Sequence, residues 1–118
     1  MSEETTEVIR LAEVYQSGTL AGYLQEQLDR SWVFAYEGNY EGIPVSLTLP
    51  FRREPYSFKE FPPVFEGLLP EGPQLEALLR THKIDRHDAF TQLLAVGEDL
   101  VGSLTVCHSN ATKYKEAR

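Results

Sequence analysis

Cysteine and long apolar runs are what this sequence most clearly lacks. Its single cysteine, Cys107, cannot form a disulfide within the chain, which favours a reducing compartment. The N-terminal segment MSEETTEV has neither the basic region nor the apolar region of a secretory signal. No apolar run approaches the roughly 18 residues that a membrane-spanning helix needs. These absences predict a cytoplasmic protein.

Basic residues are also scarce. Eleven Lys and Arg stand against eighteen Asp and Glu, which gives a formal net charge of -7. A domain that holds nucleic acid by its phosphates needs a basic face, because phosphate neutralisation supplies most of the affinity. Docking on an anionic membrane needs the same sign of charge. The composition therefore argues against direct nucleic-acid binding and against membrane binding.

Sequence motifs of catalysis are missing as well. The chain has no G-x-x-x-x-G-K-[ST] loop, no G-x-G-x-x-G, no H-R-D or D-F-G and no G-x-S-x-G. These are the motifs of phosphate-binding, dinucleotide-binding, kinase and serine-hydrolase sites. We predict that the chain is not an enzyme and needs no cofactor.

Two small groups of side chains are candidates for metal binding or nucleophilic catalysis. His82 and His87, with Asp85 and Asp88, could be imagined as metal ligands of a small enzyme. Their spacing of five across a predicted helix break does not match the i, i+3 or i, i+4 spacing of ligands on one helix face, so a solvated turn is favoured and no metal is predicted. Cys107 and His108 are neighbours on a predicted strand and would point to opposite faces.

What the chain does have is enough apolar and aromatic material for one core. It has 118 residues, among them six Tyr, six Phe and one Trp. This size is typical of one domain. We predict a flexible N-terminus over residues 1–7, a domain over residues 8–108 and a polar tail over residues 109–118.

Strand patterns dominate the first half of the chain. Apolar and β-branched residues mark strands over 8–15 and 20–24, joined by a hairpin turn through 16–19. Alternating side chains predict two further strands, over 31–36 and 45–49.

Helical spacing replaces this alternation in the second half. Leu75, Leu78 and Leu79 predict a helix whose first turn contains Pro73. A second helix is predicted from an N-cap at Asp85 to a stop at Gly97, with Phe90, Leu93 and Leu94 on its apolar face. Alternation around Leu104 and Val106 predicts a last strand. The predicted fold class is α+β: a small, curled, mainly antiparallel sheet of about five strands, partly barrel-like, with two helices between the fourth and last strands.

The segment between these halves is rich in rings and proline. Residues 51–65 hold Phe51, Tyr56, Phe58, Phe61 and Phe65, and six of the seven prolines lie between residues 50 and 73. Proline excludes a central strand or a long helix here. Either the segment wraps the sheet and its rings complete the core, or some rings face outward as anchors for a partner. The neighbouring pair of Arg52 and Arg53 could steer an acidic partner.

At this point the sequence resembles a known family. The segment FEGLLPEG (65–72), followed by DAF (88–90), LL (93–94), Gly97 and DLVGSL (99–104), is similar to the N-terminal subdomain of HipA-type serine/threonine kinase toxins. Upstream pieces agree in order, among them GYL (22–24) and VSL (45–47). The kinase motifs would lie outside this subdomain. As a standalone chain, the sequence resembles the HipS family, the small antitoxins of bacterial HipBST-type toxin–antitoxin systems.

The resemblance implies a function and a site. It implies an antitoxin that binds and inhibits a HipA-like (HipT-type) kinase, with a helix-turn-helix HipB-type protein completing the complex. The 65–72 loop would face the kinase active site, where Phe65 would enter or cover the cleft. Leu68 and Leu69 would hold the loop, and Glu66 and Glu71 would pair with basic groups of the kinase. The implied partner-binding residues are Phe65, Glu66, Gly67, Leu68, Leu69 and Glu71.

An alternative stays open. The chain could be a non-inhibitory N-terminal piece of a split or truncated HipA-type kinase, needed for folding or regulation. Exposure of the Phe65 ring is the feature that the sequence leaves undecided.

Overall fold

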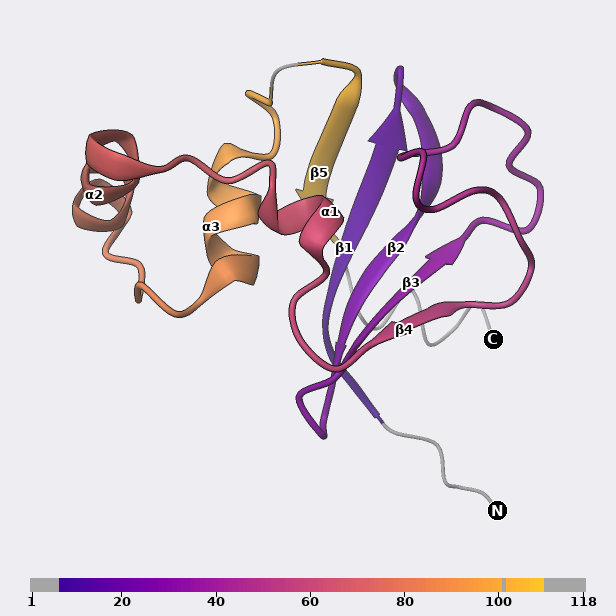
Figure 1. The fold of residues 1–118 in the computed structure, drawn as a ribbon, viewed down its shortest axis with the longest axis horizontal. Helices are drawn as coiled ribbons and strands as arrows, with labels where there is room; N and C mark the ends of the chain where they lie inside the picture. The colour runs from indigo at the N-terminus through magenta and orange to yellow at the C-terminus, as the bar shows by residue number, and fades with distance from the viewer. Residues whose placement is uncertain (1–6, 101, 110–118) are drawn as a thin grey trace.

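The computed structural model describes residues 7–100 and 102–109, which form an open sheet with helices on one side (Figure 1). Within these residues the elements, in chain order, are β1 (Val8–Gln16), β2 (Thr19–Gln27), β3 (Trp32–Tyr36), β4 (Tyr56–Phe58), α1 (Pro63–Glu66), α2 (Gly72–His82), α3 (Ala89–Val96) and β5 (Leu104–His108). The strand order is β4-β3-β2-β1-β5, and every neighbouring pair is antiparallel. The predicted α+β class with a five-stranded antiparallel sheet is confirmed.

The predicted first hairpin is the centre of this sheet. β1 and β2 are joined by Ser17 and Gly18, whose φ angles of 52° and 84° are both positive. Tight two-residue hairpin turns of type I′ need positive φ at both positions, and glycine adopts it without steric penalty. β5 pairs with the other edge of β1, so the last strand returns to the sheet formed by the first half, as predicted.

One face of the sheet carries the core. Alternate residues of the strands are buried there, among them Val14, Leu24, Phe34 and Val106. α1 and α3 contribute fully buried rings and a leucine to the same cluster, namely Phe65, Phe90 and Leu93. α3 lies between α2 and the sheet in Figure 1, so α2 is the helix farthest from the sheet.

The strand predicted over residues 45–49 is wrong. Val45 and Leu49 are buried, but Leu47 between them is fully exposed, because Ser46 and Leu49 close a tight turn. The hydroxyl of Tyr36 binds both the N–H of Val45 and the carbonyl of Leu49. These backbone groups are therefore satisfied without a neighbouring strand. The fourth strand is instead β4, a three-residue edge strand within the aromatic segment.

The helix boundaries need two corrections. The predicted helix containing Pro73 is confirmed as α2, but α3 begins at Ala89 rather than after Asp85. Asp88 is its N-cap and accepts a hydrogen bond from the N–H of Thr91 at 3.2 Å. Asp85 accepts from the N–H of His87 at 2.7 Å and so stabilises the preceding turn. The short helix α1, which starts at a proline, was not predicted.

The predictions for the chain ends fall mostly outside the described residues. Residues 1–6, 101 and 110–118 are not described, so the flexibility expected of both ends is not addressed beyond Glu7 and Ser109. Glu7 is exposed, whereas Ser109 is buried and its N–H donates to the carbonyl of Leu11. Within the described part, none of the helices has the length and apolar character needed to cross a membrane.

Candidate partner-binding surface

The 65–72 loop is ordered by a continuous series of backbone hydrogen bonds. The carbonyl of Pro62 accepts from the N–H groups of Phe65 and Glu66, both at 3.0 Å. The N–H of Gly67 then donates to Pro63, and those of Leu68 and Leu69 donate to Phe65 and Glu66 at 3.1 Å. Residues 65–69 therefore form a compact helical turn whose shape does not depend on a partner, and Glu71 follows in an extended conformation as the N-cap residue of α2.

Phe65 lies under this turn and not on its surface. Its ring is 0% exposed and its centroid is 5.7 Å from that of Phe34 on β3. The expectation that Phe65 enters the cleft of a partner is therefore corrected. The four-residue helix α1 has little stability of its own, and Phe65 is its fully buried side chain in the core, with Val64 packed beside it. The other rings of the segment also pack against the core, except that Phe51 is 40% exposed.

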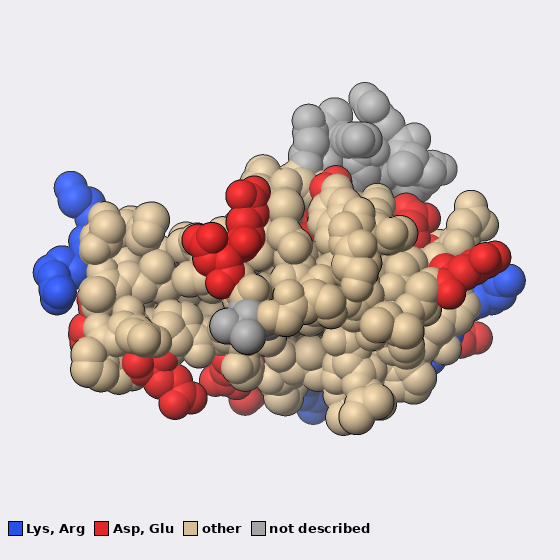
Figure 2. Space-filling view, turned by 90° about the horizontal axis from the view of Figure 1, so that it is seen from above, with Lys and Arg blue, Asp and Glu red and all other residues tan. Residues whose placement is uncertain are grey.

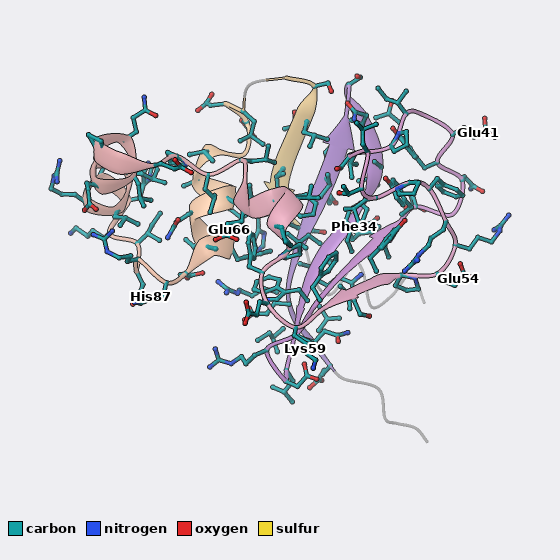
Figure 3. All side chains as sticks on the ribbon, in the orientation of Figure 1. Phe34, Glu41, Glu54, Lys59, Glu66 and His87 are labelled. Carbon is teal, nitrogen blue, oxygen red and sulfur yellow. The ribbon has the colours of Figure 1, made fainter. Side chains whose placement is uncertain are left out.

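The rest of the loop presents a polar rim. Glu66, which is labelled in Figure 3, is exposed, as are Gly67 and Glu71. Leu68 and Leu69 are half-buried against the core. Neither carboxylate makes a hydrogen bond or ion pair with any described residue. Gly67 has a φ of -65°, and an added Cβ would meet nothing closer than 3.4 Å, so glycine is not required there by the fold. The predicted residues thus divide into one buried anchor, two supporting leucines and an exposed acidic rim.

The histidine group is spread over two elements. His82 is the last residue of α2, and His87 lies in the turn before α3; both are exposed. Asp88 is engaged by Arg10 and Thr91. No group of three or more His, Cys, Asp or Glu side chains placed to hold a metal ion occurs among residues 7–100 and 102–109.

Cys107 and His108 lie side by side on β5 but differ in environment. Cys107 is half-buried and His108 is exposed. Burial, followed by the nearby charges of Glu98 and Glu13, raises the pKa of the Cys107 thiol. A raised pKa disfavours the thiolate, which is the nucleophilic form of cysteine.

An ionic network that the sequence did not indicate joins the sheet to α3. The guanidinium of Arg10 on β1 binds the carboxylate of Glu26 on β2, whose side chain is 7% exposed, and reaches Asp88 at 3.2 Å. Burial alone would raise the pKa of Asp88, but hydrogen bonds from Thr91 and the charge of Arg10 outweigh it and lower that pKa. The network fixes the N-terminus of α3 on the sheet.

A second feature that sequence reasoning missed is an apolar surface on the loop between β3 and β4. Three of the five large exposed apolar side chains in the described part of the chain come from residues 43–51: Ile43, Leu47 and Phe51. We call these three side chains the 43–51 surface. Alternation had placed Leu47 on one face with Val45 and Leu49, and no signal in the sequence distinguished a tight turn from a strand there.

The charged side chains are unevenly distributed around these surfaces. In the view of Figure 2, acidic side chains occur across the face, whereas Lys and Arg lie mainly toward the two ends of the molecule. The exposed Arg80 and Lys83 belong to the α2 end, and the exposed Arg52 and Arg53 to the loop that also carries the 43–51 surface.

Comparisons with known proteins agree with this fold. The sequence model of the HipA N-terminal domain family matches residues 12–107. A solved structure described as the N-terminal domain of HipA toxin superposes with a TM-score of 0.71 at 29% identity, covering 90% of this chain and 98% of that chain.

Two curated relatives differ in length. An uncharacterized protein of Haemophilus influenzae is 32% identical over 100 residues, which cover 85% of this chain and 93% of that protein. The protein named "Putative kinase Y4mE" of Sinorhizobium fredii is 30% identical over 100 residues, which cover 81% of this chain but 24% of the kinase. The chain therefore matches nearly all of one relative and about a quarter of the other.

Proposed function

Since the chain belongs to the HipA N-terminal domain family, we propose that it binds a HipA-like serine/threonine kinase of the HipT type and inhibits it. A helix-turn-helix HipB-type protein would join the complex through the kinase. The chain itself would supply contact and no chemistry. The observation that carries the proposal is the 65–72 loop, a backbone turn that is ordered before any partner binds.

The loop would act through its rim. Phe65 anchors the turn from below, so the exposed Glu66 and Gly67 keep their relative positions without a partner, and the exposed Glu71 stands at the start of α2. A pre-ordered loop loses little conformational entropy on docking. Its two carboxylates would pair with the basic groups that a kinase uses to bind phosphate.

The leucines would have a supporting role. Leu68 and Leu69 pack against the core and are half-exposed, so they would support the loop and add some apolar contact. Inhibition would follow from the position of the loop at the kinase active site, with no ring inserted from Phe65.

A kinase assay tests the proposal. A HipA-type kinase from the same organism is assayed for phosphoryl transfer with and without a saturating amount of the chain. We expect loss of activity with the wild type. Two further variants locate the effect. Glu66→Lys should relieve inhibition. Glu98→Lys, the same charge change at an exposed residue between α3 and β5, outside both the 65–72 loop and the 43–51 surface, should not.

The outcomes separate the proposal from its alternative. Full kinase activity despite binding would contradict inhibition and favour a structural or regulatory piece of a split kinase. The 24% coverage of "Putative kinase Y4mE" is the observation behind that alternative, since a related segment there belongs to a much longer chain. Equal inhibition by Glu66→Lys and the wild type would show that the exposed carboxylate of Glu66 has no role in inhibition.

A further inference from the structure

Leu47 occupies an unusual position for a leucine. Its side chain is 100% exposed, although Val45 and Leu49 on either side of it are buried. We propose that Leu47 is the apolar anchor of a second docking surface, distinct from the 65–72 loop, and that its occupant is the HipA-type kinase body. The inference rests on the proposed function for the identity of the partner.

The exposure of Leu47 comes from an ordered turn. The hydroxyl of Tyr36 accepts a hydrogen bond from the N–H of Val45 at 3.0 Å and binds the carbonyl of Leu49, so one side chain closes the base of the turn. Within the turn, the Ser46 hydroxyl accepts from the N–H of Thr48 at 3.1 Å. A turn held at its base and its tip presents Leu47 in one position, which is the property expected of a pre-organised anchor.

The neighbouring apolar side chains are held by the same tyrosine. The ring of Phe51 lies 5.4 Å from that of Tyr36, and Tyr40 stacks on Tyr36 at 5.8 Å. The Tyr40 hydroxyl in turn donates to the carbonyl of Ile43. All three members of the 43–51 surface are thus attached to one scaffold. Ordered, exposed apolar groups on one loop are candidates for an interaction site.

Two observations point to the kinase body as the occupant. In "Putative kinase Y4mE" a segment 30% identical to this chain makes up 24% of a longer protein, so the remainder of that protein is a surface available to such a domain. The loop also carries Arg52 and Arg53, two cations in a chain of net charge -7. Arg52 is packed over the ring of Tyr56 at 3.7 Å, and Arg53 has no ion pair with a described residue. The complementary site on the kinase is therefore an apolar pocket with a carboxylate at its edge.

A binding experiment with a matched leucine tests the inference. The affinity of the intact chain for a HipA-type kinase from the same organism is measured for the wild type, Leu47→Ser and Leu28→Ser. Leu28 is also an exposed leucine, at 60%, but lies in the turn between β2 and β3. We expect Leu47→Ser to weaken binding by about tenfold or more, as removal of a buried interface anchor does, and Leu28→Ser to leave it unchanged. Thermal melts of both variants should match the wild type.

The role of the charge of Arg53, beside the 43–51 surface, is tested separately. Arg53→Glu should slow association with the kinase, and the effect should diminish at high salt, whereas Arg80→Glu on α2 should not slow it. Equal association rates for the two variants would contradict the proposed carboxylate at the edge of the pocket on the kinase.

The remaining outcomes are distinguishable. If the wild type does not bind the kinase, the proposed function and this inference fail together. If the wild type binds and Leu47→Ser binds equally well, only this inference fails. If the chain alone forms a dimer that Leu47→Ser dissociates, the occupant is a second copy of the chain, and the assignment to the kinase is overturned.

Discussion

The rings of Phe34 and Phe65 are both fully buried, and their centroids lie 5.7 Å apart. Phe34 belongs to β3 and Phe65 to the one-turn helix α1, so this contact fastens the loop after α1 to the sheet. A four-residue helix has little stability of its own. The exposed rim of the 65–72 loop consequently depends on a side chain that no partner can reach.

Replacing Phe65 should therefore lower the stability of the fold as well as weaken binding. Phe65→Ala should lower the free energy of unfolding by about 3–5 kcal/mol, because it removes a fully buried ring and leaves a cavity. Phe51→Ala, which truncates a ring that is 40% exposed, should cost markedly less. Urea unfolding of the three proteins makes the comparison. A Phe65→Ala variant as stable as the wild type would mean that the ring is not part of the core.

Asp88 should make stability dependent on acid pH. Its pKa is lowered in the folded state, because hydrogen bonds from Thr91 and the charge of Arg10 outweigh the effect of burial. A carboxyl with a lowered folded pKa stabilises the protein above its unfolded pKa, near pH 4, and this contribution is lost as the pH falls through the folded pKa.

The comparison uses Asp88→Asn, which keeps an N-cap acceptor and removes the charge. The wild type should be more stable than Asp88→Asn near pH 6, and the difference should shrink toward pH 3. Arg10→Met should reduce the pH-dependent part of the wild-type profile, since the guanidinium is one of its causes. Unfolding free energies from urea titrations at several pH values provide the measurement. A constant difference between wild type and Asp88→Asn at all pH values would contradict the assignment.

Gly97 should not tolerate even one methyl group. Its φ of -57° is ordinary, but an added Cβ would lie 1.9 Å from the carbonyl oxygen of Val106. The N–H of Val106 also donates to the carbonyl of Gly97 at 3.0 Å, so the two backbones are held together. Gly97→Ala should cost about 1–3 kcal/mol or more through overpacking.

Gly38 is the matched control, because a Cβ there meets nothing within 4 Å. Gly38→Ala should stay within about 0.5 kcal/mol of the wild type. Thermal melts of both alanine variants suffice. Equal melting temperatures for the two would show that α3 and β5 do not approach as closely as described.

The hydroxyl of Tyr36 should stabilise the 45–49 turn. Tyr36→Phe removes the acceptor of the Val45 N–H and the group that binds the Leu49 carbonyl, both on buried residues, and should cost about 1–2 kcal/mol. Hydrogen exchange of the Val45 amide should become faster. Tyr56→Phe, whose hydroxyl binds the carbonyl of Pro50 at an exposed site, should change stability less. Unchanged exchange at Val45 in Tyr36→Phe would exclude this role.

The secondary-structure predictions that were correct rest on local information. The turn residues Ser17 and Gly18 and the spacing of Leu75, Leu78 and Leu79 act within a few residues, so the hairpin and α2 could be read directly. The start of α3 was wrong by a few residues because Asp85 and Asp88 are equally suitable caps in isolation. Arg10, 78 positions away from Asp88, contacts only the second of these.

The candidate site was harder to predict, since it depends on exposure. The composition of residues 65–72 singled out a segment that is partly exposed, but whether Phe65 faces solvent depends on where Phe34 lies. The alternation of Val45, Leu47 and Leu49 is equally compatible with a strand and with a turn. The hydroxyl of Tyr36 decides between them by binding both ends of the turn. A contact between separate segments of the chain produces no periodic pattern in the sequence of either segment.

The α+β class, the first hairpin, α2, the acidic character and the family resemblance were therefore already present in the amino-acid sequence, because each depends on composition or on residues close together along the chain. The burial of Phe65, the exposure of Leu47 and the attachment of α3 through Arg10 were decided only by the tertiary structure, because each depends on a contact between segments that are distant in sequence.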